Sequence, residues 1–355
     1  MSYILLHIIV YIIFILLCTV YLLILYVIDL RLYHDYLTRR QHKFEDQWEK
    51  AIFQYLQLRG DPEDFIKKVP SRKYLLLLEL LRQFLLSLTG SEYEKIADLI
   101  KQKRIYDFLI KRLNSFRTNR VVTSAYFLGL AKIVKAKDLL IKKLDTDSQP
   151  VFISCATSLA QIDAVEVVEK ILTRAESFKD LSRDSLLFIL LEYKQDVCAP
   201  LLKLLSSKIP DYQKEAIVSL FRQFKYQESA PEVTKTLTKT QNIDLILECL
   251  RFIREIRYVE AHYVVNPMLD HKNPHVSVEA IKTIGKLGAG PLVDKIFSKL
   301  FDDNYEVQLA AAVTISQDIP SARDKLNKIA YNVNKERATS IARMVLSEID
   351  LRRYA

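Results

Sequence analysis

The segments LDHKNPHVSVEAIKTIGKLG (269–288) and LFDDNYEVQLAAAVTIS (300–316) share one pattern when they are aligned at an offset of 31 residues. Each begins with a leucine, continues through acidic and polar turn residues, and reaches a valine followed by an alanine-centred stretch. An aliphatic residue stands four positions after the central alanine in both, which places the two side chains on one face of a helix. The pattern predicts a turn followed by a helix, repeated along the chain.

The same two coupled positions recur throughout the C-terminal two thirds of the chain. A small residue returns at spacings of 30 to 33 residues, and an aliphatic residue follows each one by four positions. A small side chain lets a neighbouring helix approach closely, and the aliphatic one fills the space beside it. Shorter apolar segments lie between these helices, for example 164–175 and 291–300, so each unit is expected to be a helix pair stacked on the next. The small residues are Ser124, Cys155, Ser185, Ala216, Cys249, Ala280, Ala311 and Ala342, and the aliphatic residues are Leu128, Leu159, Ile189, Leu220, Ile253, Ile284, Ile315 and Leu346.

These segments resemble the HEAT repeat family, in the short bacterial form of about 31 residues that is seen in the phycobilin-lyase-like group. The resemblance covers roughly 113–350 and weakens toward 181–192. It departs from the family pattern beside the valine, where Ser277 and Gln308 replace the family's usual arginine. The resemblance implies an all-α fold, an α-solenoid of stacked antiparallel helix pairs. For function it implies chiefly protein binding, since only some such solenoids bind nucleic acid or act on bilins.

The N-terminal run from Tyr3 to Ile28 predicts a single transmembrane helix. Its 26 residues include no Asp, Glu, Lys or Arg, and as a helix they would extend about 39 Å, beyond the ~30 Å hydrocarbon core of a bilayer. A cleaved signal peptide is disfavoured because no basic segment precedes the run and no small-residue cleavage site follows it. Four basic residues follow within 31–43 and none precedes, so the positive-inside rule predicts an outside N-terminus and a cytoplasmic solenoid.

The remainder of the chain is expected to be helical, because only 6 of its 355 residues are glycine and β-hairpin signals are absent. The very apolar stretch 74–88 is interpreted as a buried packing helix rather than a second membrane insertion, since it is short and contains Glu79 and Arg82. The predicted order is a transmembrane anchor (1–30), a juxtamembrane amphipathic helix (31–60), an N-terminal helical cap of the solenoid (61–112) and HEAT-like repeats (113–355).

The net charge of +9 is unevenly distributed, because residues 31–150 hold 24 Lys/Arg against 15 Asp/Glu. An ordinary solvated surface is one interpretation of the basic segment 101–143. Contact with anionic lipid headgroups or an acidic partner near the bilayer is the other. Nucleic acid is not expected as the partner, since no aromatic stacking motif lies among these charges. The basic residues are Lys101, Lys103, Arg104, Lys111, Arg112, Arg117, Arg120, Lys132, Lys135, Lys137, Lys142 and Lys143.

The sequence offers no defensible set of catalytic, cofactor-binding or metal-binding residues. GKLGAGP (285–291) lacks the following Lys-Ser/Thr and the preceding strand of a P-loop, and is predicted to end one repeat helix and begin the next. Pro274 lies between His271 and His275 and keeps them off a common helical face. No cysteine belongs to a CxxC pair, and three of the four lie in apolar helical patterns. The four cysteines are Cys18, Cys155, Cys198 and Cys249. We therefore expect a non-enzymatic protein without a cofactor.

The anchor and the repeat array favour a membrane-anchored cytoplasmic scaffold or adaptor that binds a protein partner. A membrane enzyme complex such as an envelope polysaccharide synthase would be one such partner. The alternative is a solenoid enzyme or a nucleic-acid-binding protein of the lyase-like or base-repair-like HEAT type, and a third hypothesis is a receptor whose solenoid faces outside. Binding is expected from residues spread over several repeats, rather than from the glycine-rich loop.

Overall fold

The computed structural model describes residues 19–21, 23–24, 26–28, 47–57, 61–319, 322–331 and 336–354. These residues form helices and turns, with no strand among them, as the sequence predicts. The chain divides into two compact units, Met1–Lys111 and Arg112–Ala355.

The first unit is a small group of packed helices. Its helical segment 47–57 lies against α4, because Tyr55 Oη donates to the Lys95 carbonyl at 3.3 Å and Lys95 Nζ donates to the Leu56 carbonyl at 2.9 Å. Helix α3 buries most of its leucines, so the prediction of a buried packing helix at 74–88 is confirmed. The labelled helices are α2 (Pro62–Lys67), η1 (Ser71–Lys73), α3 (Tyr74–Ser87), α4 (Gly90–Lys101) and α5 (Lys103–Leu113), whose last two residues belong to the second unit.

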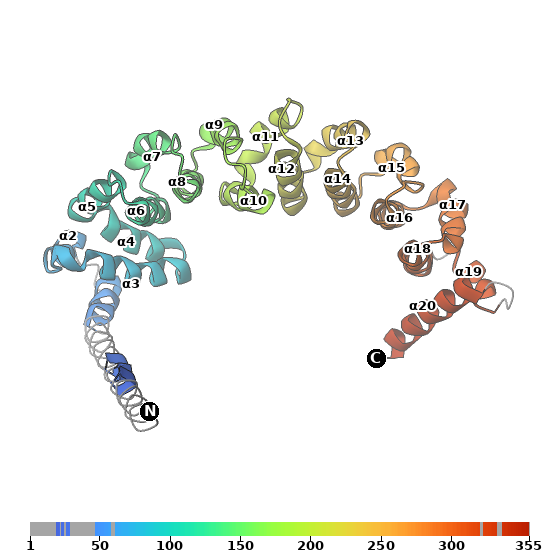
Figure 1. The fold of residues 1–355 in the computed structure, drawn as a ribbon, viewed down its shortest axis with the longest axis horizontal. Coiled ribbons are helices and arrows are strands. Elements are labelled where there is room, and N and C mark those ends of the chain that lie inside the picture. The colour runs from blue at the N-terminus through green and yellow to red at the C-terminus, as the bar shows by residue number, and fades with distance from the viewer. Residues whose placement is uncertain are drawn as a thin grey trace, which may run out of the picture. The chain divides into compact units, whose positions relative to one another are not determined.

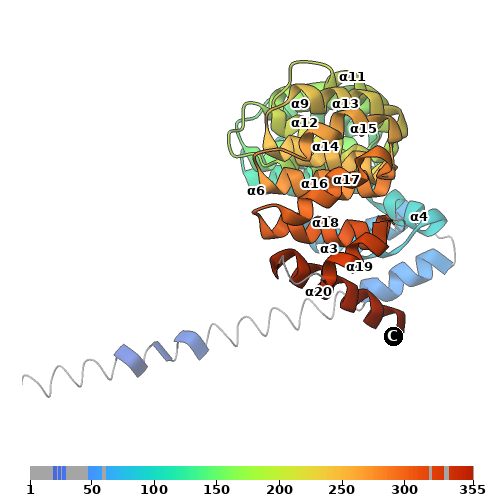
Figure 2. The same cartoon turned by 90° about the vertical axis from the view of Figure 1, so that its right-hand side faces the viewer.

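The second unit is a two-layer helical array (Figure 1). The even-numbered helices α6 to α18 lie side by side along its inner side, and the shorter odd-numbered helices α7 to α17 lie along its outer side. Figure 2 looks at this unit from its C-terminal end, with α19 and α20 foremost. The helices are α6 (Thr118–Leu130), α7 (Lys137–Lys143), α8 (Gln149–Gln161), α9 (Val168–Ala175), α10 (Arg183–Glu192), α11 (Cys198–Leu205), α12 (Asp211–Phe224), α13 (Ala230–Lys239), α14 (Ile243–Ile256), α15 (His262–Met268), α16 (Pro274–Leu287), α17 (Val293–Ser298), α18 (Tyr305–Asp318), α19 (Arg323–Ala330) and α20 (Glu336–Tyr354).

Short 3₁₀ turns lead into most of the odd-numbered helices and so join each even helix to its outer neighbour. They are η2 (Val134–Ala136), η3 (Val165–Val167), η4 (Lys194–Val197), η5 (Gln227–Ser229), η6 (Val259–Ala261) and η7 (Gly290–Leu292), while η8 (Lys299–Phe301) follows α17.

The repeat predicted from the small and aliphatic residues coincides with the even-numbered helices. Every predicted small residue lies on one of the helices α6 to α20, and all except Ser185 are buried, as are all the aliphatic residues four positions later. Ser185 is only half-buried because α10 begins at Arg183, so this serine stands in the first turn. Its backbone N–H donates to the capping Ser182 Oγ at 3.1 Å. The weakened resemblance at 181–192 therefore corresponds to a repeat helix that lacks its first turn.

The turn after each of the even helices α6 to α16 is built around one residue with positive φ. These residues follow one another at 31 or 32 positions, and only the last is a glycine. After α6, for example, the Ile133 N–H donates back to the Leu128 carbonyl at 2.9 Å, the 6→1 bond of a Schellman turn. Gly288 is thus the turn residue of its repeat, as GKLGAGP predicts. The positive-φ series is Lys132, Asp163, Lys194, Lys225, Arg257 and Gly288.

Two other glycines let neighbouring even helices approach closely. A Cβ built on Gly129 of α6 would lie 2.5 Å from the Ser158 Cα on α8, so any side chain there would meet backbone. A Cβ built on Gly285 of α16 would instead meet the side chains of Thr314 and Asp318 on α18. Both glycines occupy the position one residue after the aliphatic residue of the repeat, and their role is packing.

The two residues that replace the family's arginine hold the end of the preceding helix. Ser277 Oγ donates to the Leu269 carbonyl at 2.7 Å, directly after α15. Gln308 Nε2 donates to the Asp302 carbonyl at 2.5 Å, directly after η8. Carbonyls at a helix end lack partners within the helix, so these side chains satisfy groups that burial would otherwise leave unpaired.

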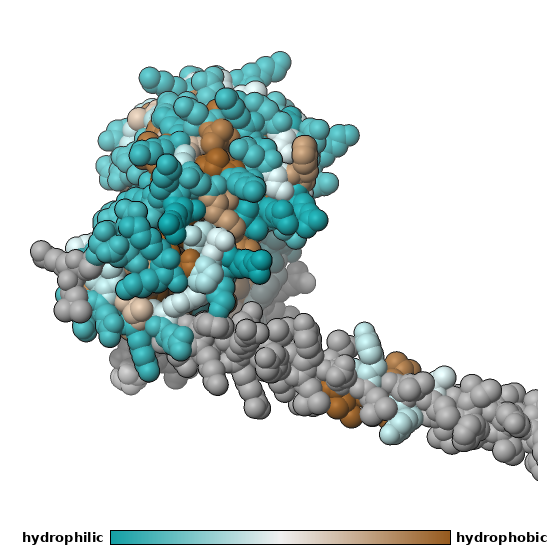
Figure 3. Space-filling model, turned by 90° about the vertical axis from the view of Figure 1, so that its left-hand side faces the viewer, coloured by the Kyte–Doolittle hydropathy of each residue, from teal (hydrophilic) through white to brown (hydrophobic). Residues whose placement is uncertain are grey.

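The predicted anchor, Tyr3 to Ile28, lies largely outside the described residues, as do 31–46 and 58–60 of the predicted juxtamembrane helix. Across the described ranges, no helix combines the length and the apolar character that crossing a membrane requires. The described residues between 19 and 28 are helical, and their hydrophobic side chains are exposed (Figure 3).

Candidate binding surface on the even-numbered helices

Three successive even helices of the second unit bury a glutamate at the same repeat position. Glu215 on α12, Glu248 on α14 and Glu279 on α16 each directly precede the small residue of their repeat. Their exposed fractions are 7%, 1% and 7%. A carboxylate at this depth requires paired cations or hydrogen-bond donors, because burying an unpaired charge is strongly unfavourable.

Glu248 accepts hydrogen bonds from arginines of three helices. Arg222 on α12 donates from Nε to Oε1 at 2.7 Å, and Arg251, one turn further along α14, donates from Nη1 to Oε2 at 3.4 Å. Arg183 on α10 reaches the same Oε2 from its Nη2 at 3.3 Å. To do so it passes over α12, where its Nη2 also hydrogen-bonds the fully buried Ser219 hydroxyl.

Glu279 binds two arginines in the same manner. Arg254 of α14 donates from Nη1 to Oε1, and Arg251 Nε lies 4.0 Å from Oε2. Arg251 therefore lies between the two carboxylates and links them into one network. We call Arg183, Arg222, Arg251 and Arg254 the arginine cluster.

The arginine cluster lies at the exposed surface of the even-numbered layer, above its buried carboxylates. Its four side chains are 30% to 41% exposed, whereas the Glu248 side chain is 2% exposed. A guanidinium carries five N–H donors in a planar fork, and the bonds to glutamate use only part of them. The four guanidinium groups lie next to the carboxylates of Glu248 and Glu279. The carboxylate of Asp184 lies 3.9 Å from Arg183. The arrangement can hold an anion by charge-assisted hydrogen bonds.

Glu215 lies beside this network. Burial, together with the charge of Asp244, raises the pKa of its carboxyl to about 7, while Arg183 opposes the shift. The carboxyl therefore changes its ionisation near neutral pH, unlike an exposed glutamate.

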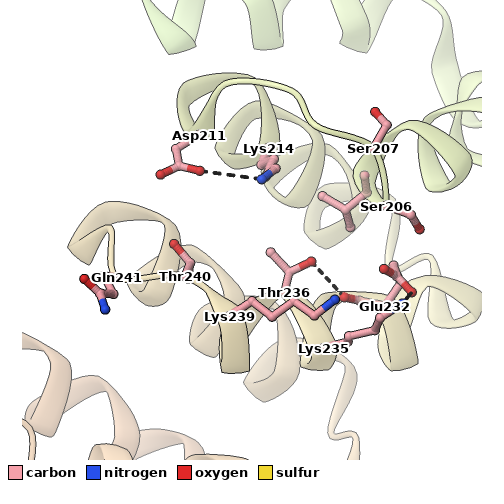
Figure 4. A pocket seen from close by; sticks show the side chains of 11 residues that line it. Ser206, Ser207, Asp211, Lys214, Glu232, Lys235, Thr236, Lys239, Thr240 and Gln241 are labelled. Carbon is pink, nitrogen blue, oxygen red and sulfur yellow. Dashed lines mark hydrogen bonds and ion pairs between the residues drawn. The ribbon is translucent and has the colours of Figure 1, made fainter.

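A pocket of about 230 Å³ lies near the outer layer, between α11, the start of α12 and the end of α13. Two of its three lysines are directed toward acids in the same pocket, with Lys214 Nζ 3.7 Å from Asp211 and Lys235 Nζ 3.2 Å from Glu232 (Figure 4). These pairs are partly exposed, and contact between them contributes little. The lining residues are Leu205, Ser206, Ser207, Asp211, Lys214, Glu232, Lys235, Thr236, Lys239, Thr240 and Gln241.

The basic residues predicted as a contact surface are divided between the units. Lys101, Lys103, Arg104 and Lys111 belong to the first unit, and the others to the second. In the first unit, Lys101 forms ion pairs with Glu94 at 3.3 Å and Asp98 at 3.1 Å.

Within the second unit, Arg117 and Arg120 lie at the start of α6, whereas Lys132, Lys135 and Lys137 follow its end. Helix α6, which is 13 residues and about 20 Å long, lies between Arg117 and these lysines. Lys137 is paired with Glu166, and burial together with Arg120 lowers the pKa of Arg112. The basic residues of the second unit therefore do not lie at one point, and contact with lipid or a partner remains a prediction.

His271, His275 and the three described cysteines take structural positions. His271 Nδ1 accepts the Asn273 N–H at 3.0 Å in the turn before α16, and His275 Nδ1 lies 3.4 Å from Glu306. The three described cysteines are buried and unbridged. Burial raises the pKa of Cys155 to about 12 and that of Cys198 to about 11, which opposes thiolate formation. No group of three or more His, Cys, Asp or Glu side chains in the described ranges could hold a metal ion.

The arginine cluster was not predicted from the sequence, although a signal was present. A glutamate directly before the small residue appears in three successive repeats, at 215, 248 and 279. An acid in a position that faces a neighbouring helix predicts a buried ion pair. Which arginines reach it could not be read from spacing, because Arg183 lies two even helices away.

No family model matches the chain, and no curated protein does either. Among solved structures, Kap121p matches with a TM-score of 0.51 at 13% identity, over 79% of this chain and 38% of Kap121p. Kap121p bound to RanGTP also gives 0.51, at 12% identity, over 85% of this chain and 38% of that one. The fold is a HEAT/armadillo-like helical repeat. At this identity the likeness establishes fold alone, and it confirms the predicted solenoid.

Two further solved structures of the same kind match more loosely. The complex of CpcE and CpcF of phycocyanin lyase from Nostoc sp. PCC7120 gives a TM-score of 0.29 at 17% identity, over 68% of this chain and 86% of that one. A designed armadillo repeat protein gives 0.31 at 16% identity, over 59% of this chain and 98% of that one.

Proposed function

We propose that this chain is a membrane-anchored scaffold that binds a protein partner on the even-numbered layer of its helical repeats. The observation that carries the proposal is the arginine cluster, which combines side chains from three helices on one exposed surface of a repeat array. Repeat arrays present such extended surfaces because each unit adds side chains at a fixed spacing. Kap121p, whose fold the chain shares, has been crystallised with RanGTP.

The membrane part of the proposal rests on the apolar run from Tyr3 to Ile28 and the basic residues that follow it. It places the N-terminus outside and the solenoid in the cytoplasm, where basic residues of the segment 101–143 would contact anionic lipid headgroups. A membrane enzyme complex, such as an envelope polysaccharide synthase, is the kind of partner that an anchored scaffold would hold. No catalytic step belongs to this function.

Photo-crosslinking tests the partner-binding part. In the full-length chain, a photo-crosslinking amino acid replaces either Lys282 of α16 in the even-numbered layer or Lys235 of α13 in the odd-numbered layer. Both positions are exposed. The complex is then purified in detergent. A partner crosslinked from the even-layer position alone supports the proposal. Recovery of the solenoid without any partner, or crosslinking only from the odd-layer position, contradicts it.

Cysteine labelling tests the topology. Asp147, whose side chain is fully exposed, is replaced by cysteine, and intact cells are treated with a membrane-impermeant thiol reagent. The three described native cysteines are buried and give little background. Protection until the cells are permeabilised supports a cytoplasmic solenoid, and labelling in intact cells favours the outside receptor. Retention of the chain in membranes after carbonate washing tests the anchor separately.

The alternative, a solenoid enzyme or a nucleic-acid-binding protein of the lyase-like or base-repair-like type, remains a hypothesis. The purified full-length chain tests it directly: binding of labelled single-stranded DNA that survives 200 mM salt would favour it over the scaffold.

A further inference from the structure

We propose that the arginine cluster is a binding site for an extended acidic peptide of the partner protein, whose carboxylates meet Arg183, Arg222, Arg251 and Arg254. This inference rests on the proposed scaffold function and names the chemistry of its partner. It also assigns the site to α10, α12 and α14, which lie side by side in Figure 1, together with Glu279 of α16.

The cluster is held in place before any partner arrives. Glu248 and Glu279 are buried acceptors that fix the guanidinium groups by hydrogen bonds, so little side-chain freedom remains to be lost on binding. Glu248 and Glu279 offset two of the cluster's four positive charges, and Asp184, 3.9 Å from Arg183, offsets a third. The four side chains are 30% to 41% exposed, and at their exposed parts a carboxylate can accept two parallel bonds from one guanidinium.

The distribution of charge favours discrete carboxylates over a continuous polyanion. Helices α10, α12, α14 and α16 together contain seven Lys/Arg and eight Asp/Glu residues. Acids lie at the starts of three of these helices, at Asp184, Asp211 and Asp244. A nucleic acid backbone or an anionic bilayer carries charge throughout and would meet these acids as well as the arginines. A peptide can place acids at the arginines and neutral residues elsewhere.

The geometry also sets a spacing for the ligand. Packed helices lie about 8–10 Å apart, and a peptide in the extended polyproline II conformation advances about 3.1 Å per residue with three residues per turn, so every third side chain lies on one face. An acidic residue at every third position therefore matches the spacing between the arginines at Glu248 on α14 and Arg254 at Glu279 on α16. The amphipathic alternative, an acidic helix laid across the layer, would repeat at three or four residues over about 5.4 Å and would match only neighbouring arginines of α14.

Fluorescence anisotropy with the purified full-length chain tests the site. The probe is a fluorescein-labelled (Glu-Gly-Ser)₄ peptide, with (Gln-Gly-Ser)₄ as the uncharged control. We expect saturable binding of the glutamate peptide at low salt and none of the control. The double variant Arg183→Gln/Arg251→Gln should weaken binding at least about tenfold. Arg183→Lys/Arg251→Lys should weaken it less, since lysine keeps the charge and loses the fork.

The matched control removes two positive charges from the outer layer. Lys235→Gln/Lys239→Gln alters the lining of the pocket and should leave peptide affinity unchanged. Circular dichroism and urea unfolding confirm that each variant is folded. Equal weakening by both double variants would overturn the site, as would full affinity in the arginine variant. Tighter binding of single-stranded DNA or of phosphatidylserine vesicles, lost in the same arginine variant, would overturn the peptide as the ligand.

The crosslinking assay separates this inference from the scaffold function. If the natural partner is captured equally by the native chain and by Arg183→Gln/Arg251→Gln, the scaffold stands and the arginine site is wrong. If neither chain captures a partner, the scaffold function itself fails.

Discussion

The interface between α6 and α8 and the interfaces joining α12, α14 and α16 use the same repeat positions for different chemistry. In α8, the position before the small residue is Ser154, whose hydroxyl donates to the Val122 carbonyl of α6 at 2.9 Å. In α14 that position is Glu248, which holds arginines of three helices. The first interface is neutral and closely packed beside Gly129. The second leaves charged side chains at the surface.

The contrast separates two roles that a repeat can serve. Where small residues bring two helices together, the interface stabilises the array and presents little to a partner. Where buried acids orient arginines, the interface gains solvent-facing donors, although ion pairs at such depth add little net stability. The four predictions that follow test this division, from the largest expected effect on the free energy of unfolding to the smallest.

Gly129→Ala should destabilise the protein by about 3 kcal/mol, because the new Cβ would lie 2.5 Å from the Ser158 Cα and the helices must separate. Gly285→Ala should lower the free energy of unfolding by less, because its Cβ would meet the side chains of Thr314 and Asp318, which can move. Urea unfolding of the full-length chain measures both.

Thr314→Ser supplies the control for the glycine pair. It removes the methyl group that faces Gly285 and should restore stability to Gly285→Ala but not to Gly129→Ala. Equal costs for the two glycine variants would show that side-chain freedom at α18 does not distinguish the interfaces.

Glu215→Gln should stabilise the protein by about 2 kcal/mol at pH 8 and hardly at all below pH 4.5. The pKa of the buried carboxyl is raised to about 7 in the folded state. The folded protein therefore keeps a proton that the unfolded chain releases, so native stability falls as pH rises from about 4.5 to 7. Glutamine has no proton to lose and avoids this loss. Urea unfolding at pH 5 and pH 8 gives the comparison.

Glu255→Gln is the control for that titration. A hydrogen bond from Lys225 lowers the pKa of Glu255, so this carboxylate favours the folded state above its unfolded pKa and loses that effect in acid. Replacing the Glu255 carboxylate should slightly destabilise the protein at pH 8, which is opposite in sign to the effect of Glu215→Gln. A Glu215→Gln gain that is the same at both pH values would mean that ionisation is not its cause.

The sequence predicted the repeated helices of the fold. It did not predict the arginine cluster, which occurs at one place in the array. Small residues such as Ala280 and aliphatic residues such as Ile284 recur because every repeat needs the same close contact, and a period can be counted. The arginine cluster depends on Arg183 crossing α12 to reach Glu248, a contact across 65 residues that follows from how the helices stack. The late start of α10 was visible only as a weak match, because spacing alone does not show where a helix begins.

Tyr193→Phe should stabilise the protein by about 1 kcal/mol. This tyrosine ends α10, between the neutral and the charged interfaces, and its ring is fully buried. Its hydroxyl is buried without a hydrogen-bond partner in the part of the chain that the structure describes. An unpaired buried hydroxyl costs free energy that phenylalanine avoids. Tyr55→Phe removes a hydroxyl that does donate a bond and should destabilise. Destabilisation by Tyr193→Phe would show that the hydroxyl is paired.

Arg257→Gly and Lys132→Gly should each stabilise the protein by about 0.5 kcal/mol, because both turn residues hold a positive φ that glycine adopts without strain. The gain is small, since glycine also has more conformational freedom to lose on folding. One turn follows α14 and the other follows α6, so similar gains would show that the turn geometry is common to both regions and that only the helix faces differ. Gly288→Ala, which imposes the strain instead, should destabilise by a similar amount. A loss of stability in Arg257→Gly alone would mean that contacts of this side chain outweigh its backbone strain, and would extend the charged region to the turn after α14.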